Sequence, residues 1–288
     1  MEHRHFTSRI VEVMTARHHI TSSLTKCGMC IHLKLVCSVL FNAQAWRNFT
    51  ENDFNELQKL QLRLLRNIVD APKSISKSFL FLELGVLPIR YEIHRRQLTF
   101  MHHIVNLEPD DPVRALYEQM KCFPGERNWL NDVTHSAITY GVEIGEDKLR
   151  DISKESFKKE VKLAIQQYAF TKLKEECSSL TKTRNIQYDT YQPQKYLTCL
   201  YPSQARTVLK CRARCVDIKT QRPYLFKDTL CRWCNLEDET ISHIINCGSD
   251  TPMDEMDLDA LDVVDIDVET KLIMYSTRIK RFLDMVDC

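Results

Sequence analysis

The chain has 288 residues, of which 43% are hydrophobic and 27% charged, a composition typical of a globular protein. The formal net charge is +1, but residues 250–270 hold nine acidic side chains and no basic one, so the rest carries +10. The sequence predicts neither a membrane span nor a secretory signal, because it has no apolar run of about 18 residues and none follows the N-terminal MEHRHF.

Six glycines and nine prolines are few for this length, which favours helices over a turn-rich β fold. We expect a mainly α protein, an irregular helical bundle with a small zinc-bound module. The expected divisions are helical domains over 1–108 and 109–222, a zinc module over 223–249, and an acidic segment with a terminal helix over 250–288. We also expect an intracellular chain, in the nucleus or cytoplasm, whose 12 cysteines are reduced.

At the N-terminus, residues 8–24 have weak helical periodicity, and residues 29–45 form the most apolar stretch, which predicts a buried helix. Four potential metal ligands lie where these segments meet: Cys27, Cys30, His32 and Cys37. A second metal site is one interpretation. Packing of the cysteines as small hydrophobic residues is the favoured one, because the cluster runs into the apolar helix.

Thr50 and Asp53 have the spacing of a capping box, which opens an amphipathic helix that ends at Ala71-Pro72. Residues 82–107 predict a short turn and then a helix from about Pro88, a residue suited to a first helical turn. The side chains expected to point inward from this second helix are Ile93, Leu98, Met101 and Ile104.

Residues 107–150 are more broken, with turns expected at Asp110-Asp111-Pro112 and Pro124-Gly125. Ser153 is expected to cap a long helix, 178–202 to be irregular, and Ser203 to cap a helix ending near Asp217. The acidic segment is expected to be disordered, and a last helix to run from about Thr270 to Asp287.

The segment CRWCNLEDETISHIINC (231–247) has the spacing of a metal site. Cys231 and Cys234 form a Cys-x2-Cys turn, and His243 and Cys247 lie one helical turn apart. Thiolate and imidazole are the ligands that Zn²⁺ takes in tetrahedral sites. Because four protein ligands leave no position for a reacting water, the predicted zinc is structural. The alternative is a chance grouping in a cysteine-rich chain.

Two segments are strongly basic, 59–103 with a net charge of +5 and 205–232 with +6. Such surfaces bind phosphate backbones by releasing counterions, although a solvated helix face is the simpler alternative. The best expected contacts to RNA or DNA are Arg206, Lys210, Arg214 and Arg232, and the second group is Arg63, Arg66, Arg95 and Arg96. Trp233 has two possible roles, stacking on a base or, as favoured here, packing on the helix after Ser203.

The run SVLFNAQAWRNFTENDFNELQKLQLRLLRNIVDAPKSISKSFLFLELGVLPIRYEIHRRQLTFMHHIV (38–105) resembles the region after the polymerase palm in non-LTR retrotransposon reverse transcriptases. The matching features are Trp46, Ala71-Pro72, the LELGVLPI turn and Arg95-Arg96. The later run LKCRARCVDIKTQRPYLFKDTLCRWC…HIINC is similar to that family's C-terminal helix and Cys-Cys-His-Cys module. The resemblance covers most of residues 8–248. It implies a thumb-like and linker body whose partner is template RNA or target DNA.

The polymerases of this family need three carboxylates that hold two Mg²⁺ ions, two of them in an aromatic-x-Asp-Asp turn. The sequence has no such turn, and Asp110-Asp111 lies between prolines in an expected loop. We therefore expect a non-catalytic fragment. The rival is a protein-interaction or structural remnant, in which apolar faces such as Leu57, Leu64 and Ile68 recruit a partner or self-associate. The third hypothesis is that the chain comes from a degenerate open reading frame.

Overall fold

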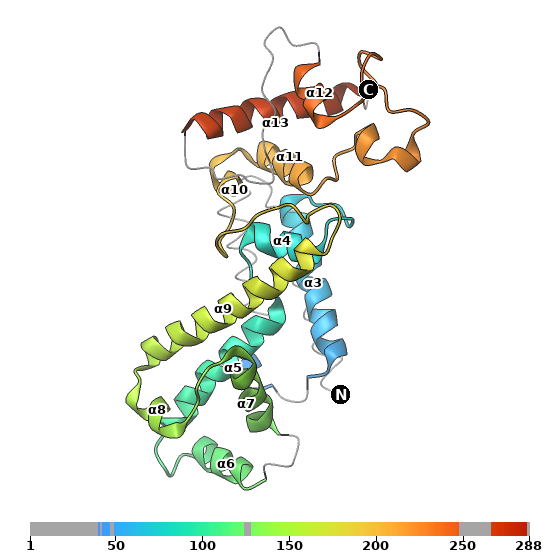
Figure 1. Ribbon diagram of the computed structural model, residues 1–288. Helices are drawn as coiled ribbons and strands as arrows, with labels where there is room; N and C mark the ends of the chain where they lie inside the picture. Colours follow the sequence, from blue (N-terminus) through green and yellow to red (C-terminus); the bar gives the residue numbers. More distant parts are fainter. Residues whose placement is uncertain (1–39, 41, 47–48, 124–127, 248–265, 287–288) are drawn as a thin grey trace, which may run out of the picture. The chain divides into compact units, whose positions relative to one another are not determined.

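The computed structural model describes residues 40, 42–46, 49–123, 128–247 and 266–286, which are the coloured parts of the ribbon in Figure 1. Within these ranges the chain is mainly helical, and its only β pairing is an isolated bridge between Leu230 and Asp238. The prediction of a mainly α protein is confirmed. Several predictions concern residues that the structure does not describe. These are the helix over 8–24, nearly all of the helix over 29–45, the cluster from Cys27 to Cys37, and most of the acidic segment.

Two compact units, each assembled from separate stretches of the chain, make up the protein. Among described residues, unit 1 contains those up to Leu64 and 87–172, and unit 2 contains 65–86 and everything from Leu173 onward. The divisions expected from the sequence follow chain order instead, and they stay predictions.

Unit 1 is organised around helix α5 (Ile89–Val105), which contacts four neighbouring elements. These are the 3₁₀ turn η1 (Ala43–Ala45) and helices α6 (Pro112–Lys121), α7 (Trp129–Tyr140) and α8 (Glu146–Asp151). The first parts of α3 (Glu51–Val69) and α9 (Lys154–Ser178) complete the unit. All four side chains expected to point inward from α5 are buried.

The predicted helix starts of unit 1 follow local hydrogen bonding. The amide of Thr50 donates to Asp53 Oδ2 at 2.9 Å and the amide of Asp53 donates to Thr50 Oγ1 at 3.3 Å, as a capping box requires. Pro88 is the N-cap of α5, and the amide of Ser156 donates to Ser153 Oγ at the start of α9. The predicted capping residues therefore mark the starts of these helices.

Residues 107–150 are more regular than the sequence indicated, because they form three short helices. Asp111 caps α6 by accepting from the amide of Val113 at 2.7 Å, with Pro112 in the first turn. Asn128 caps α7, which ends at Gly141 with a positive φ of 67°. The polar and proline residues interpreted as turns are thus caps, and Pro124-Gly125 lies outside the described residues.

In the part of unit 2 that the structure describes, the rest of α3 and α9 is joined by five further helices. They are α4 (Lys77–Leu84), α10 (Tyr196–Cys199), α11 (Pro202–Arg212), α12 (Ile241–Asn246) and α13 (Ile266–Val286), with 3₁₀ turns η2 (Lys219–Gln221) and η3 (Pro223–Leu225). We expected residues 82–107 to begin with a turn. This prediction was wrong in part, because Leu82–Leu84 form the last residues of helix α4. Almost every residue of α4 is buried, so it has no polar face to reveal a helical period.

Helix α11 also differs from expectation at both ends. It begins at Pro202, with Tyr201 rather than Ser203 as N-cap, and it ends at Arg212 rather than near Asp217. The predicted irregular stretch before it contains the single turn of α10. Cys211 and Cys215 are buried, in agreement with the core role expected for them.

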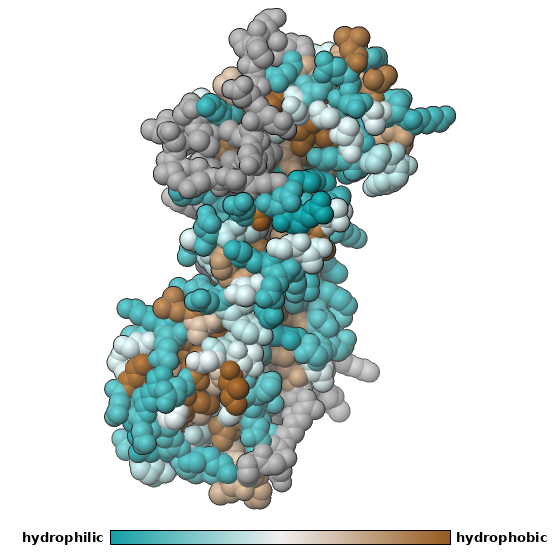
Figure 2. All heavy atoms as spheres, viewed as in Figure 1, coloured by the Kyte–Doolittle hydropathy of each residue, from teal (hydrophilic) through white to brown (hydrophobic). Residues whose placement is uncertain are grey.

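On the face shown in Figure 2, hydrophilic residues cover most of the surface and hydrophobic residues form small separate patches. Across the described part of the chain, none of the helices combines the length and apolarity needed to cross a lipid bilayer.

Candidate metal centre

A tight backbone turn brings the first two cysteines together. The amide of Cys231 donates to the Glu237 carbonyl and that of Glu239 donates to the Thr229 carbonyl, both at 2.7 Å, on either side of the Leu230–Asp238 bridge. Within this loop, the amide of Asn235 donates to the carbonyl of Cys231 at 2.9 Å, and Asn235 has a positive φ of 55°. The left-handed residue closes the turn, and asparagine tolerates that conformation better than most residues.

The other two ligands come from helix α12. Its N-cap Thr240 accepts from the amide of His243 at 3.0 Å, which starts the helix three residues before the first ligand. The amide of Cys247 donates to the His243 carbonyl at 2.7 Å, so both side chains leave the same face. The helix predicted over Thr240–Asn246 is confirmed.

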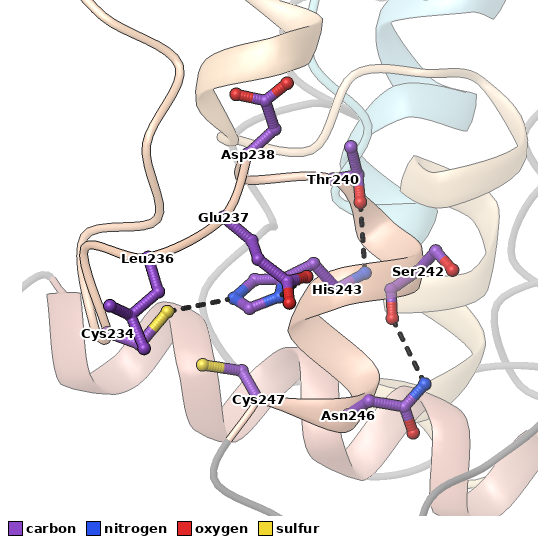
Figure 3. A pocket seen from close by; sticks show the side chains of 9 residues that line it. All are labelled: Cys234, Leu236, Glu237, Asp238, Thr240, Ser242, His243, Asn246 and Cys247. Atoms are coloured by element: carbon purple, nitrogen blue, oxygen red, sulfur yellow. Dashed lines mark hydrogen bonds and ion pairs between the residues drawn. The ribbon is translucent and has the colours of Figure 1, made fainter.

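The ligand atoms of Cys231, Cys234, His243 and Cys247 all lie within 4.8 Å of one another. The Sγ atoms of Cys231 and Cys247 are 3.9 Å apart, and Cys234 Sγ is 3.2 Å from His243 Nε2. A tetrahedral zinc site with Zn–S bonds of about 2.3 Å has S···S edges of about 3.8 Å. Figure 3 shows Cys234, His243 and Cys247 pointing into one space. This cluster is therefore able to hold a metal ion.

The thiols of the cluster experience opposite electrostatic environments. Backbone N–H groups of Leu236 and Glu237 lower the pKa of Cys234 to about 6, so its thiolate is already favoured. Burial, with the neighbouring sulfurs of Cys234 and Cys231, raises the pKa of Cys247 to about 12. A divalent cation between the sulfurs would remove that repulsion and hold both groups as thiolates.

Glu237 lies behind the histidine ligand. Its Oε2 is 3.0 Å from His243 Nδ1, which leaves Nε2 facing Cys234 (Figure 3). A carboxylate on the outer nitrogen fixes the ring orientation and raises the basicity of the ligating nitrogen. This role of Glu237 was not predictable from the sequence, because Glu237 is one of three consecutive acidic residues.

The cluster is joined to a small hydrophobic core. Cys231 is fully buried against Ile244 and Ile245 of α12, and the same core contains Tyr275, Ile279 and Phe282 of α13. The Trp233 ring is 41% exposed and its centroid lies 6.5 Å from that of Phe282. The ring neighbour of Trp233 is thus on α13, whereas we expected it on the helix after Ser203.

Arg232 forms hydrogen bonds within the same module. Its guanidinium donates to both carboxylate oxygens of Glu239, at 2.7 to 3.1 Å, and to the Asp217 carbonyl at 2.6 Å. Glu239 is fully buried; burial acts to raise its pKa, but hydrogen bonds from Arg232 outweigh this and lower it. The guanidinium that we expected to contact nucleic acid is therefore engaged in the frame of the module.

The second group of predicted contacts is mostly engaged within the protein. Arg66 donates to the Ile75 carbonyl at 3.1 Å, Arg95 to Glu92 at 2.7 Å, and Arg96 to the Leu40 carbonyl at 2.9 Å. Arg63, in contrast, is exposed on α3.

Arg206, Lys210 and Arg214 repeat every four residues, a spacing that predicts one face of a helix, but the structure does not place them so. Arg206 is half-buried, and Lys210 pairs with Asp70 at 3.2 Å. Arg214 lies beyond the last residue of α11 and has a positive φ of 48°, so it does not continue the helical repeat. The three residues are near one another in the chain but do not form the single helix face that the spacing predicted.

Exposed cations that were not among the predicted contacts also lie in unit 2. Lys280 and Arg281 are exposed on α13, which contacts both α11 and α12, and Lys227 is exposed in the loop before the first cysteine. The adjacent pair Lys280-Arg281 was visible in the sequence of the last helix. It was not predicted as a contact, because the acidic run before it dominates the net charge of that part of the chain.

The chain matches no protein-family model, no curated protein and no solved structure. The resemblance to non-LTR reverse transcriptases thus depends on the sequence motifs quoted above and stays a prediction.

Proposed function

We propose that this chain is a non-catalytic nucleic-acid-binding protein, similar to the C-terminal portion of a non-LTR retrotransposon reverse transcriptase. The metal module acts as a structural support, with Zn²⁺ as its ion, and basic residues beside it bind RNA or DNA. The observation that carries the proposal is the convergence of four ligand atoms within 4.8 Å at the edge of a basic segment.

The ligand set favours a structural rather than a catalytic ion. Three sulfurs and one imidazole nitrogen would fill the four positions of a tetrahedral ion and leave none for substrate or a reacting water. Three thiolates favour a soft or borderline ion such as Zn²⁺ over Mg²⁺ or Ca²⁺, which prefer oxygen ligands. Small zinc-binding modules such as zinc fingers use the ion to order a segment that is too short to fold alone.

The proposed interface combines residues of α11, α13 and the loop between α11 and the metal ligands. Helix α11, which carries Arg206 and Lys210, contacts α13, which carries Lys280 and Arg281, and all four residues belong to unit 2. Phosphate contacts come largely from Arg and Lys side chains that are free to reach the nucleic-acid backbone, so exposed cations are the better candidates. We assign the largest share of the binding to Lys227, Lys280 and Arg281, because these three are exposed.

The test is binding of a single-stranded RNA to the full chain over a series of salt concentrations. Neutralising about five phosphates predicts a slope of about −3.5 for log affinity against log salt. The double variant Lys280→Gln/Arg281→Gln should weaken binding and reduce that slope by about one to two. A duplex DNA of the same length shows which nucleic acid is preferred.

The matched control is Lys159→Gln/Lys162→Gln, which removes the same charge from exposed positions on α9 in unit 1. Binding by the control should equal that of the wild-type chain. Equal losses in both variants would indicate an unspecific charge effect, and the absence of salt-dependent binding would reject the proposal.

A second candidate function is protein binding by the metal module. Tyr224, Leu225 and Leu236 are 79%, 58% and 81% exposed, which is unusual for large apolar side chains close together in the chain. The helix face we expected to recruit a partner is better covered, because Leu57 is buried and Leu64 and Ile68 are half-buried. Self-association in sedimentation that Leu236→Ser abolishes and RNA does not change would favour this second function.

A further inference from the structure

Unit 1 contains a cavity of about 320 Å³ that is distinct from the metal module. Six aromatic side chains line it, from the segment before α3 and from helices α3, α5, α7 and α9: Trp46, Phe49, Phe54, Tyr91, Tyr140 and Tyr168. This volume is at the lower end of the range for small-molecule sites, about 300–1,000 Å³. The cavity thus has the size for one planar ring system with a small substituent.

The rings form two groups. Trp46 and Phe49 are stacked, with centroids 5.1 Å apart and planes at 14°. Tyr91, Tyr140 and Tyr168 make a second group of edge-to-face contacts, with centroids 5.1 to 6.2 Å apart. Aromatic faces and edges at these spacings offer stacking and T-shaped positions to a further ring.

Buried polar contacts hold the aromatic walls in place before any ligand arrives. The amide of Gln97, itself buried, donates to the Trp46 carbonyl at 2.9 Å, and Trp129 Nε1 donates to the Gln44 carbonyl at 2.8 Å. These bonds fix the segment of Trp46 to α5 and α7. A preformed wall lowers the entropy lost on binding.

The polar groups of the lining suit an uncharged ligand. Arg90 forms an ion pair with Glu51 and lies 4.5 Å over the Phe54 ring, so its charge is already compensated. Burial lowers the pKa of His94 to about 4, so the ring is neutral, with Nδ1 2.5 Å from the Tyr140 hydroxyl. Asp132 also lines the cavity. The positive charge of Arg90 is paired with Glu51, and Asp132 adds a negative charge to the lining. These three residues therefore offer a phosphate no uncompensated positive charge.

We propose that this aromatic cavity binds a nucleobase from single-stranded RNA or DNA, with the sugar-phosphate chain outside. Aromatic rings that stack bases are a general feature of single-strand binding, because every base has a π face. His94, His135 and Asp132 offer hydrogen-bonding groups to the edge of the base. The inference depends on the proposed function for the source of the ligand, but it concerns a different unit of the protein.

The experiment measures binding of adenosine, uridine and AMP to the full chain by calorimetry, at two salt concentrations. The nucleoside should bind saturably, its affinity should not depend on salt, and the phosphate of AMP should give no gain. Thr139→Trp, which introduces a large ring from an exposed lining position, should reduce the affinity by about 5- to 150-fold, the range that a stacked base contributes.

The matched control is Ile138→Trp, which adds the same ring at the preceding residue of α7, 74% exposed and not part of the lining. It should bind nucleosides like the wild-type chain. Equal affinity in Thr139→Trp and wild type, or no saturable nucleoside binding, would reject the cavity site. Binding of N-acetyltryptophanamide in place of nucleosides would also reject it, in favour of a protein partner.

The two proposals fail separately. Loss of nucleoside binding in Thr139→Trp with an unchanged salt slope for RNA supports the cavity and leaves the basic interface intact. Salt-dependent RNA binding without nucleoside binding rejects only the cavity.

Discussion

Glu83 of α4 is fully buried and accepts hydrogen bonds from three partners in unit 2. Tyr188 and Tyr196 donate through their hydroxyls at 2.8 and 2.5 Å, and Arg212 donates from Nε at 3.0 Å. Arg212 is 1% exposed, so it belongs to this network and not to the basic surface on which its charge was counted. The network joins α4 to α10 and α11.

We predict that Glu83→Gln destabilises unit 2 by about 3–5 kcal/mol, because it leaves the buried charge of Arg212 without its partner. Urea unfolding measures the change. The control Glu155→Gln removes a carboxylate of which 75% of the side chain is exposed, and it should leave the urea unfolding midpoint nearly unchanged. A loss below about 1 kcal/mol in Glu83→Gln would contradict the role given to the network.

Gly85 ends α4 in the left-handed region, with φ of 58°, and a Cβ there would lie 2.4 Å from the Pro193 nitrogen. Gly85→Ala should therefore cost more than Gly141→Ala, since Gly141 has a similar φ of 67° but open space around it. The Gly141 variant measures backbone strain alone, about 1–2 kcal/mol. Equal losses in the two variants would show that the backbones near Pro193 separate easily.

Glu237→Gln should weaken metal binding by about 10- to 100-fold, because the neutral amide orients and polarises His243 less strongly than the carboxylate. Competition with a chromophoric chelator measures the affinity. Asp238→Asn is a suitable control, because Asp238 is adjacent but its carboxylate accepts from Thr229 and points away from the histidine (Figure 3). An unchanged affinity in Glu237→Gln would remove Glu237 from the site.

At the level of elements, an ionic cluster fastens α6 to α8. Glu146 at the start of α8 accepts from Arg114, Tyr117 and Lys121 of α6 at 2.6 to 3.1 Å. Burial acts to raise the pKa of Glu146, but hydrogen bonds from Lys121 and Arg114 outweigh it and lower the pKa to about 2. The carboxylate is therefore held in its ionised form.

A carboxylate with a depressed pKa in the folded state stabilises the protein above its unfolded pKa, about 4.3. This contribution should be lost as the pH falls from that value towards 2, because the unfolded chain then binds a proton that the folded one refuses. Glu146→Gln should be less stable at neutral pH and less sensitive to acid in this window. Thermal unfolding between pH 2 and 7 tests this, and parallel profiles for variant and wild type would contradict it.

The sequence located helices well where they have a cap and one apolar face. The cap at Thr50 and the inward residues of α5 were predicted correctly, as was α12 after Thr240. The sequence failed for α4, because Phe79 to Leu84 are buried on all sides and show no period. It also failed for α6, where Asp111 and Pro112 indicate a turn and a helix start equally well.

Across the whole molecule, the clustering of the four candidate metal ligands was predictable, whereas the exposure of the basic side chains was not. Ligand type and spacing identified Cys231, Cys234, His243 and Cys247 before any geometry, since few other chemistries need that pattern. For a basic residue, however, only tertiary packing determines whether its charge faces water. Arg232 with Glu239 and Arg212 with Glu83 are inward-facing ion pairs whose partners are 7 and 129 residues away in sequence.

We propose that one metal ion holds the segment 231–247 in its fold. The most direct measurement is the metal content of the purified full chain, combined with X-ray absorption at the zinc edge and circular dichroism before and after a chelator. We predict one zinc per chain with three sulfur neighbours and one nitrogen neighbour, and loss of the module's structure when the ion is removed, because binding free energy of about 10–16 kcal/mol would be lost from folding. A chain that purifies without metal, takes up none, and keeps the same spectrum in chelator would contradict the account.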